Sequence, residues 1–103
     1  MRIVAVKTLK QYWADEPLAE QPLKAWIAEI KEANFHNHNE LKSQFGSASI
    51  INKKRVVFNI HGNRFRLVVD FEYKYQVVFI TWLGTHAEYD KIIVEDVLYH
   101  RTY

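Results

Sequence analysis

Two arginines, two residues apart, raise the first chemical question in this sequence. Residues 58–69 read FNIHGNRFRLVV, so Arg64 and Arg66 alternate with Phe65 and Leu67. A period of two is typical of a β-strand, whose successive side chains leave from opposite faces. Both guanidinium groups are therefore expected on one face, with the apolar side chains in a core. Because a guanidinium fork matches phosphate oxygens bidentately, the pair predicts a phosphate-binding strand.

A second group of polar side chains follows the next apolar run, QVVFITWL. Three groups that can carry or orient a proton come shortly after this run: His86, Tyr89 and Asp90. If the two apolar stretches pair as a hairpin, the end of the second returns to the start of the first, next to the arginines. A histidine carries protons near neutral pH, and general acid or base catalysis contributes about 10²–10⁴-fold. The set suits RNA cleavage by the substrate's own 2′-hydroxyl, which requires neither a metal nor a protein nucleophile.

Further basic residues precede the first strand of this region. Lys53, Lys54 and Arg55 stand at its start, and Asn59 shares the parity of Arg55. No acidic residue occurs between positions 41 and 69, whereas residues 15–40 contain six acids. The asymmetry predicts a side that faces a polyanion and a solvated back, with simple surface solvation as the open alternative.

Each candidate also has a structural reading that the sequence leaves open. His86 can cap the adjacent turn, Tyr89 can be a core residue with a wet hydroxyl, and Asp90 can cap a helix. Arg64 is as consistent with an ordinary surface residue as with a phosphate ligand. Arg66 lies well inside the strand between apolar neighbours and is the stronger functional candidate.

The segment HNHNE resembles a cluster of metal ligands. It contains His36, His38 and Glu40, but no third histidine has the spacing of a zinc signature. A polar loop after a helix is the favoured interpretation, and no metal or other cofactor is predicted.

The elements that must position these residues predict an α+β fold. Two N-terminal helices are expected to lie against a curved, largely antiparallel sheet. Thr8 is expected to cap the first helix, and residues 88–97 fit a short helix or a final strand equally well. The expected strands are 2–6, 55–60, 64–73 and 76–83, and the expected helices are 8–14 and 22–34, with a helical turn at 40–45.

Composition bounds the class of protein. A chain of 103 residues has the size of one domain, predicted to span residues 1–103. It has no cysteine, which excludes disulfides and thiolate metal sites. No signal peptide or membrane span is recognised, so a cytoplasmic protein is expected.

Three segments together resemble the HigB family of bacterial toxins, within the RelE-like superfamily of ribosome-dependent mRNA interferases. They are RVVFNIHGNRFRLVV, QVVFITWLGTHAEYD and the preceding FGSAS with Asn52. The combined pattern F-N-I-x-G-N-x-F-R followed by G-T-H-x-E-Y-D is much more specific than either half. The resemblance is strong over residues 42–91 and loose over the N-terminal elements.

The resemblance implies a RelE-like fold and cleavage of mRNA in the ribosomal A site. It implies that Arg66 binds the scissile phosphate, that His86 moves a proton and that Tyr89 stacks or transfers a proton. It assigns RNA contacts to Lys53, Lys54 and Arg55, to which we add Asn59 and Arg64, with Asp90 supporting the base. Because no glutamate lies beside Arg66, the general base stays unassigned.

The resemblance also implies partners. These are the ribosome, mRNA and a helix-turn-helix antitoxin of the HigA type, with DNA contacted only through that antitoxin. The main alternative function is a non-catalytic RNA- or protein-binding module of the same fold, and the second is a metal-dependent nuclease using His36 and His38.

Overall fold

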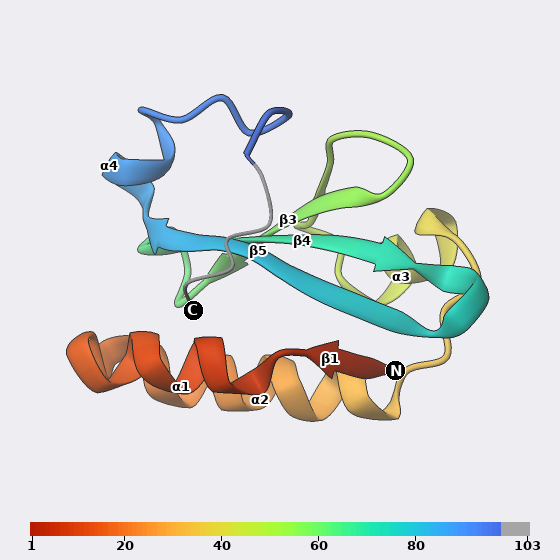
Figure 1. The fold of residues 1–103 in the computed structure, drawn as a ribbon, viewed down its shortest axis with the longest axis horizontal. Helices are drawn as coiled ribbons and strands as arrows, with labels where there is room; N and C mark the ends of the chain where they lie inside the picture. The colour runs from red at the N-terminus through yellow and green to blue at the C-terminus, as the bar shows by residue number, and fades with distance from the viewer. Residues whose placement is uncertain (98–103) are drawn as a thin grey trace.

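A sheet of five strands organises the computed structural model, which describes residues 1–97 (Figure 1). Its spatial order is β1 (Arg2–Val4), β5 (Val77–Thr85), β4 (Phe65–Glu72), β3 (Arg55–Ile60) and β2 (Ser49–Ile50). Only β1 runs parallel to its neighbour, β5, and the other pairs are antiparallel. The expected largely antiparallel sheet is thus a mixed sheet with one parallel edge strand.

Two N-terminal helices cover one face of this sheet (Figure 1). They are α1 (Val6–Asp15) and α2 (Glu20–Glu32), with the 3₁₀ turn η1 (Pro17–Ala19) between them. Leu9, Leu23 and Ile30 are fully buried and join the inward side chains of the strands in one core. The helical pattern of the sequence is therefore confirmed, because apolar spacing of three and four residues produces this buried stripe.

The start of α1 differs from the sequence-based expectation. Thr8 does not cap the helix, which begins two residues earlier at Val6. Ala5 is the N-cap, with the extended backbone that leads out of β1, and its carbonyl accepts the amide of Thr8 at 3.1 Å. A helix can start without a side-chain cap where tertiary packing of its apolar face stabilises it.

Two shorter helices complete the four α-helices of residues 1–97. The first, α3 (His38–Gln44), is capped by Asn37, whose side chain accepts the amide of Glu40 at 2.9 Å. The second, α4 (His86–Tyr89), settles the open choice at residues 88–97, where turns follow α4 and no strand forms. None of the helices described is both long and apolar enough to cross a membrane.

Tight turns fix the ends of the β-hairpins. Between β3 and β4, His61 and Gly62 have φ of 54° and 62°, a left-handed conformation that glycine adopts at little cost. Because β4 begins only at Phe65, Arg64 belongs to this turn and not to the strand, contrary to the sequence-based expectation. The β4–β5 connection is the 3₁₀ turn η2 (Tyr73–Tyr75).

A bulge in β5 changes which face its last residues occupy. Val69 pairs with Ile80 and Val68 pairs with Trp82, so Thr81 is an extra residue on β5. Because of it, Leu83 faces the helix-side core, whereas Trp82 shares the opposite face with Val68. The strand also continues to Thr85, two residues past the expected end at position 83.

Candidate active site

One end of the sheet brings together the start of β4 and the end of β5. Phe65 pairs with Thr85, Arg66 pairs with Gly84, and the amide of His86 donates to the carbonyl of Arg64 at 2.9 Å. The turn after β3 and helix α4 therefore lie at the same end (Figure 1). This is the juxtaposition that the hairpin pattern predicts.

Arg66 is the charged group of this end that the sheet itself fixes. It stands between Asn59 on β3 and Gly84 on β5, on the face opposite α1 and α2. Its Nη1 donates to the carbonyls of Asn63 and Phe65, both at 3.2 Å, and its Nη2 donates to Oδ1 of Asn63 at 3.3 Å. These bonds are long, so they orient the guanidinium without consuming its capacity to bind a stronger acceptor.

A capping box holds α4 in place. The hydroxyl of Thr85 accepts the amide of Glu88 at 3.1 Å, and Oε1 of Glu88 accepts the amide of Thr85 at 2.8 Å. His86 is the first residue of this helix, and its Nδ1 lies 3.2 Å from Oδ2 of Asp90, one turn further on. Both side chains are exposed, so an ion pair forms here when the imidazole is protonated, and Asp90 orients the ring.

Tyr89 lies at the inner side of α4. Burial raises the pKa of its hydroxyl, and this exceeds the opposing effect of the positive charge on Arg66. The nearby carboxylates of Glu95 and Asp90 raise the pKa of Tyr89 further. The phenol is therefore protonated at neutral pH, and it can donate a hydrogen bond or a proton.

An open hollow adjoins Arg66 on the β3 side. It has a volume of about 470 Å³ and is lined by Ser47, Asn59, Gly62 and Asn63. Two of these residues neighbour Arg66 directly: Asn59 pairs with it across the strands, and Asn63 accepts its hydrogen bonds. The structure thus groups six of the nine predicted site residues, which are Asn59, Arg64, Arg66, His86, Tyr89 and Asp90.

The other three predicted residues lie at the opposite end of β3. From Arg55 to Asn59 the strand advances four residues, about 13 Å at the usual rise. Lys53 is exposed there and lines a second hollow of about 350 Å³ with His36, His38 and Tyr73. Lys54 is also exposed, and its Nζ pairs with Oε2 of Glu72 at 2.9 Å, a hydrogen bond that raises the pKa of the lysine.

Arg55 is buried, which argues against the expected contact with RNA. The residue is 8% exposed, and its Nε and Nη2 donate to the two carboxylate oxygens of Asp70 at 2.7 and 2.8 Å. Its Nη1 donates to backbone carbonyls after α4, those of Val94, Glu95 and Val97. All its guanidinium nitrogens donate to groups within the protein, so Arg55 is not placed to bind RNA.

The histidines of HNHNE have protein partners in place of a metal. Nε2 of His38 lies 2.9 Å from the carbonyl of Asn52, which can only accept, so Nε2 carries a hydrogen. Nδ1 of His38 lies 2.6 Å from the hydroxyl of Tyr73, and Nδ1 of His36 lies 3.1 Å from Glu40. Among residues 1–97, no three histidine or acidic side chains group in a way that could hold a metal ion.

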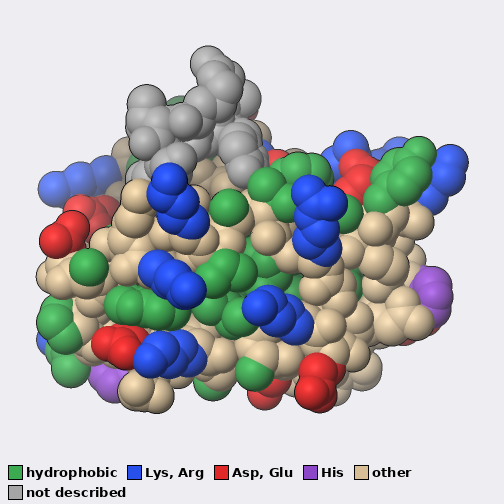
Figure 2. All heavy atoms as spheres, turned by 60° about the horizontal axis from the view of Figure 1, so that its bottom comes forward, with side chains coloured by type: hydrophobic (Ala, Val, Ile, Leu, Met, Phe, Trp, Pro, Cys, Tyr) green, Lys and Arg blue, Asp and Glu red, His purple; other side chains and the backbone are tan. Residues whose placement is uncertain are grey.

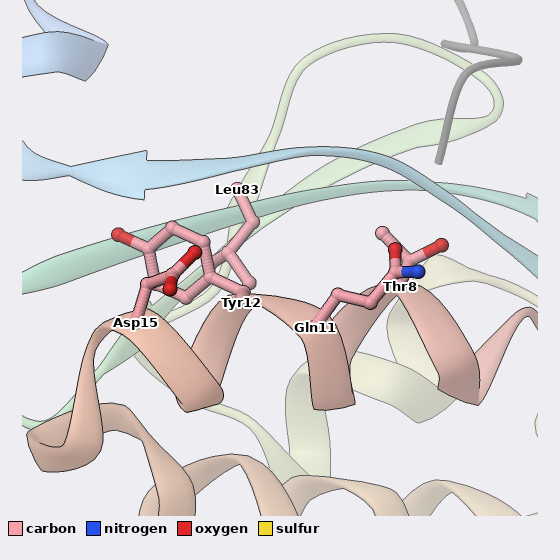
Figure 3. Close-up of a pocket in the computed structure, with 5 residues that line it drawn as sticks. All are labelled: Thr8, Gln11, Tyr12, Asp15 and Leu83. Carbon is pink, nitrogen blue, oxygen red and sulfur yellow. The ribbon is translucent and has the colours of Figure 1, made fainter.

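The helix-covered face has different features. A cavity of about 160 Å³ lies between α1 and β5, where the Tyr12 ring lies next to Leu83 (Figure 3). Figure 2 shows Lys and Arg side chains among hydrophobic ones in the middle of the helix side, with acidic groups nearer its rim. The predicted solvated back is therefore mixed in charge, since α1 and α2 also carry exposed Lys7, Lys10, Lys24 and Lys31.

Three residues at the site are not among the predicted site residues. Asn63 orients Arg66, although its position in an HGN turn suggested only a turn. Trp82 lies 6.1 Å from Tyr89 between ring centroids, and Gly84 pairs with Arg66. Strict alternation from Val78 and Ile80 would put the last two on the helix-covered face, because it does not include the extra residue Thr81.

Comparison with known proteins identifies the family. The family model of the HigB toxin, described as the RelE-like toxic component of a toxin-antitoxin system, matches residues 19–92. The match includes β4, β5 and α4, and so every residue grouped around Arg66. A search of curated proteins finds no match. Because the family model covers more than half of the chain, this protein belongs to the HigB family and is the toxin component of a toxin-antitoxin system.

Proposed function

We propose that this toxin is a metal-independent endoribonuclease that cleaves mRNA in the ribosomal A site and so inhibits translation and growth. RelE-like toxins are generally endoribonucleases, which supports this reaction class. The observation that carries the proposal is the position of Arg66, a sheet-fixed guanidinium whose neighbours are a protonated tyrosine and a histidine–aspartate pair.

The reaction is an internal transfer at phosphorus. The 2′-oxygen of one nucleotide attacks the adjacent phosphorus, a 2′,3′-cyclic phosphate forms, and the 5′-oxygen of the next nucleotide leaves. One group removes the 2′-proton and another protonates the leaving oxygen, so charge accumulates on the phosphate between the two transfers. A cation there stabilises the transition state most, because preorganised charge acts where new charge develops.

The side chains fit these roles by their chemistry. Arg66 binds the scissile phosphate, and Arg64, in the adjoining turn, binds a neighbouring one. His86 moves a proton, with Asp90 orienting its ring at 3.2 Å. Tyr89, whose pKa is raised by burial, is protonated at neutral pH and so is available as a donor and not as the base. His86 is then the base, and Tyr89 protonates or hydrogen-bonds the leaving oxygen.

Two further groups have proposed RNA contacts. Asn59 presents an amide to the hollow beside Arg66 and can bind ribose or phosphate there. Lys53 and Lys54 come just before β3, whose length from Arg55 to Asn59 is about 13 Å, and could bind phosphates of ribosomal RNA or of mRNA more distant from the break. A reaction on the ribosome places the protein in the cytoplasm.

The antitoxin partner follows from membership of a toxin-antitoxin family. We propose that it is a helix-turn-helix protein of the HigA type, and that this toxin contacts DNA only through it. A cationic RNA-binding surface would otherwise act on the cell's own ribosomes.

The alternative is a non-catalytic RNA- or protein-binding module of the same fold. The exposure of His86 favours this alternative. A catalytic histidine works best where water is excluded, and in the free protein His86 is in contact with solvent. Such a module would bind RNA with strong salt dependence and create no new RNA ends.

Primer extension on a defined mRNA in a reconstituted translation system tests the proposal. New ends are expected only when ribosomes are present, and they should persist after treatment with a strong chelator followed by restoration of the magnesium that ribosomes require. The His86→Ala variant is the matched control, since the exposed side chain can be removed without loss of the fold. If correctly folded protein produces no ends under either condition, the binding module is correct.

A further inference from the structure

The indole ring of Trp82 lies at the candidate site without a role in the proposed reaction. Trp82 pairs with Val68, and both lie on the sheet face that also carries Arg66. Without the extra residue Thr81, alternation from Val78 and Ile80 would direct position 82 into the helix-side core. Bulges often redirect side chains next to active sites. The bulge therefore places a large aromatic ring on the functional face.

Gly84 provides the space in which this ring lies. A Cβ at position 84 would lie 2.5 Å from Cη2 and 2.7 Å from Cζ2 of Trp82. It would also lie 2.9 Å from Oε1 of Glu88, so any other residue would force both the ring and this carboxylate to move, since real Cβ contacts are not this short. Gly84 itself pairs with Arg66. The indole thus extends along β5 toward the residue that stands beside the arginine.

A second aromatic ring completes the surface. Tyr89 on α4 lies 6.1 Å from Trp82 between centroids, with an angle of 54° between the ring planes. Both residues are partly exposed, whereas aromatic residues such as Phe65 and Phe71 are buried in the core. The tilted rings are not stacked on each other, so neither ring covers the face of the other.

We propose that Trp82, next to Tyr89, is a stacking surface for a nucleobase of single-stranded RNA beside the phosphate that Arg66 binds. The proposal rests on the proposed function only in taking Arg66 as the phosphate ligand. Aromatic side chains bind unpaired bases by stacking, and the interaction tolerates every base because each has a π-face. The surface therefore positions the nucleotide against Arg66 and selects for unpaired RNA more than for base identity.

Fluorine NMR of protein labelled with 5-fluorotryptophan tests this directly. The probe is a short RNA of 2′-O-methyl nucleotides, which lacks the attacking hydroxyl, and its comparison is an abasic oligomer of equal length and charge. We expect the Trp82 resonance to move with the RNA and not with the abasic oligomer. The resonance of Trp26, which is 3% exposed, should stay unchanged with both. A Trp82 resonance that stays still, or that moves equally with both oligomers, overturns the proposal.

Two variants measure the contribution to affinity. Stacking on one aromatic side chain contributes enough to change affinity roughly tenfold, so Trp82→Ala should weaken RNA binding by about that factor. Gly84→Ala should weaken it several-fold by displacing the ring, and also the Glu88 carboxylate, with every charge retained. Trp13→Phe is the matched control, because this partly buried tryptophan lies on α1 beneath Lys24 and should bind as wild type. If the Trp82→Ala and Gly84→Ala proteins bind RNA as tightly as the control, no stacking surface exists.

The two proposals fail separately. Ribosome-dependent cleavage without a base-dependent shift of Trp82 overturns the stacking surface alone. A base-dependent shift without any cleavage overturns the nuclease and leaves an RNA-binding site on the same face.

Discussion

The two arginines that look equivalent in sequence have different surroundings. Arg66 lies within β4, paired on both sides and partly buried, and its guanidinium is oriented by Asn63. Arg64 lies in the turn before the strand, with an exposed side chain, and its backbone has the structural role: the amide donates to His61 and the carbonyl accepts from His86. A fixed cation stabilises a transition state more than a mobile one, because its orientation costs nothing during the reaction.

This difference predicts unequal effects of a conservative exchange. Arg66→Lys keeps the charge but loses the bidentate fork, and we expect ribosome-dependent cleavage to fall at least about tenfold. Arg66→Ala, which removes the charge as well, should reduce cleavage by about 10²–10³-fold. Arg64→Lys is the matched comparison and should stay within about twofold of wild type, since an exposed arginine bound to phosphate acts mainly as a charge. Equal losses for the two lysine variants in primer extension would show that the sheet does not distinguish them.

The protonation state of Tyr89 gives a second test at this scale. Burial raises the pKa of its hydroxyl above the ordinary value of 10.0, so the neutral phenol should persist beyond that pH. Tyrosinate absorbance measured for wild type and for Tyr89→Phe isolates this one group in the difference between the two titrations. The midpoint of this difference should lie above pH 10. A midpoint below pH 10 would contradict the raised pKa, and one near neutral pH would make the phenolate available as the base in place of His86.

At the scale of elements, the sequence predicted what depends on regular periodicity. The bounds of β3 match the expected strand, and the hairpin of β4 and β5 places His86 beside Arg64 as expected. The bulge at Thr81 could not be predicted, because an apolar run satisfies either face and alternation then carries no information about register. The expected RNA contact of Arg55 fails for another reason. Its partner Asp70 is 15 positions away in sequence, and only the strand register brings the two side chains together.

The capping box of α4 links local structure to the site. Thr85→Ala removes the acceptor for the amide of Glu88 and should lower the free energy of unfolding by about 1 kcal/mol, the usual contribution of such a cap. Because α4 has only four residues, we expect it to fray and His86 and Tyr89 to lose their fixed positions. Cleavage should therefore fall well beyond the loss of folded protein.

The conservative variant separates the cap from the side chain itself. Thr85→Ser retains the hydroxyl acceptor and should behave as wild type in both urea denaturation and cleavage. A Thr85→Ala protein with full activity would mean that β5 and the Arg64 carbonyl alone position His86.

At the scale of the whole molecule, the sheet has different attachments on its two faces. Helices α1 and α2 cover one face through an apolar core (Figure 1). On the other face, the buried guanidinium of Arg55 holds the chain that follows α4. It binds Asp70 and also donates to the carbonyls of Val94, Glu95 and Val97. That segment also brings Glu95 close enough to influence Tyr89. Arg55 thus connects the far end of β3 to the surroundings of the site without touching it.

Removing this buried cation should destabilise the protein and release the segment after α4. Arg55→Ala leaves Asp70, whose side chain is 26% exposed, without its partner, and we expect the free energy of unfolding to fall by about 3 kcal/mol. Lys54→Ala is the matched control, because it breaks the ion pair between Glu72 of β4 and the residue just before β3. Lys54 is 64% exposed, so the loss should leave urea denaturation unchanged. Hydrogen exchange should accelerate at residues 92–97 in Arg55→Ala and not in the control. Equal stability of the two variants would mean that water replaces Arg55 at these carbonyls, and that the apolar core alone holds the fold.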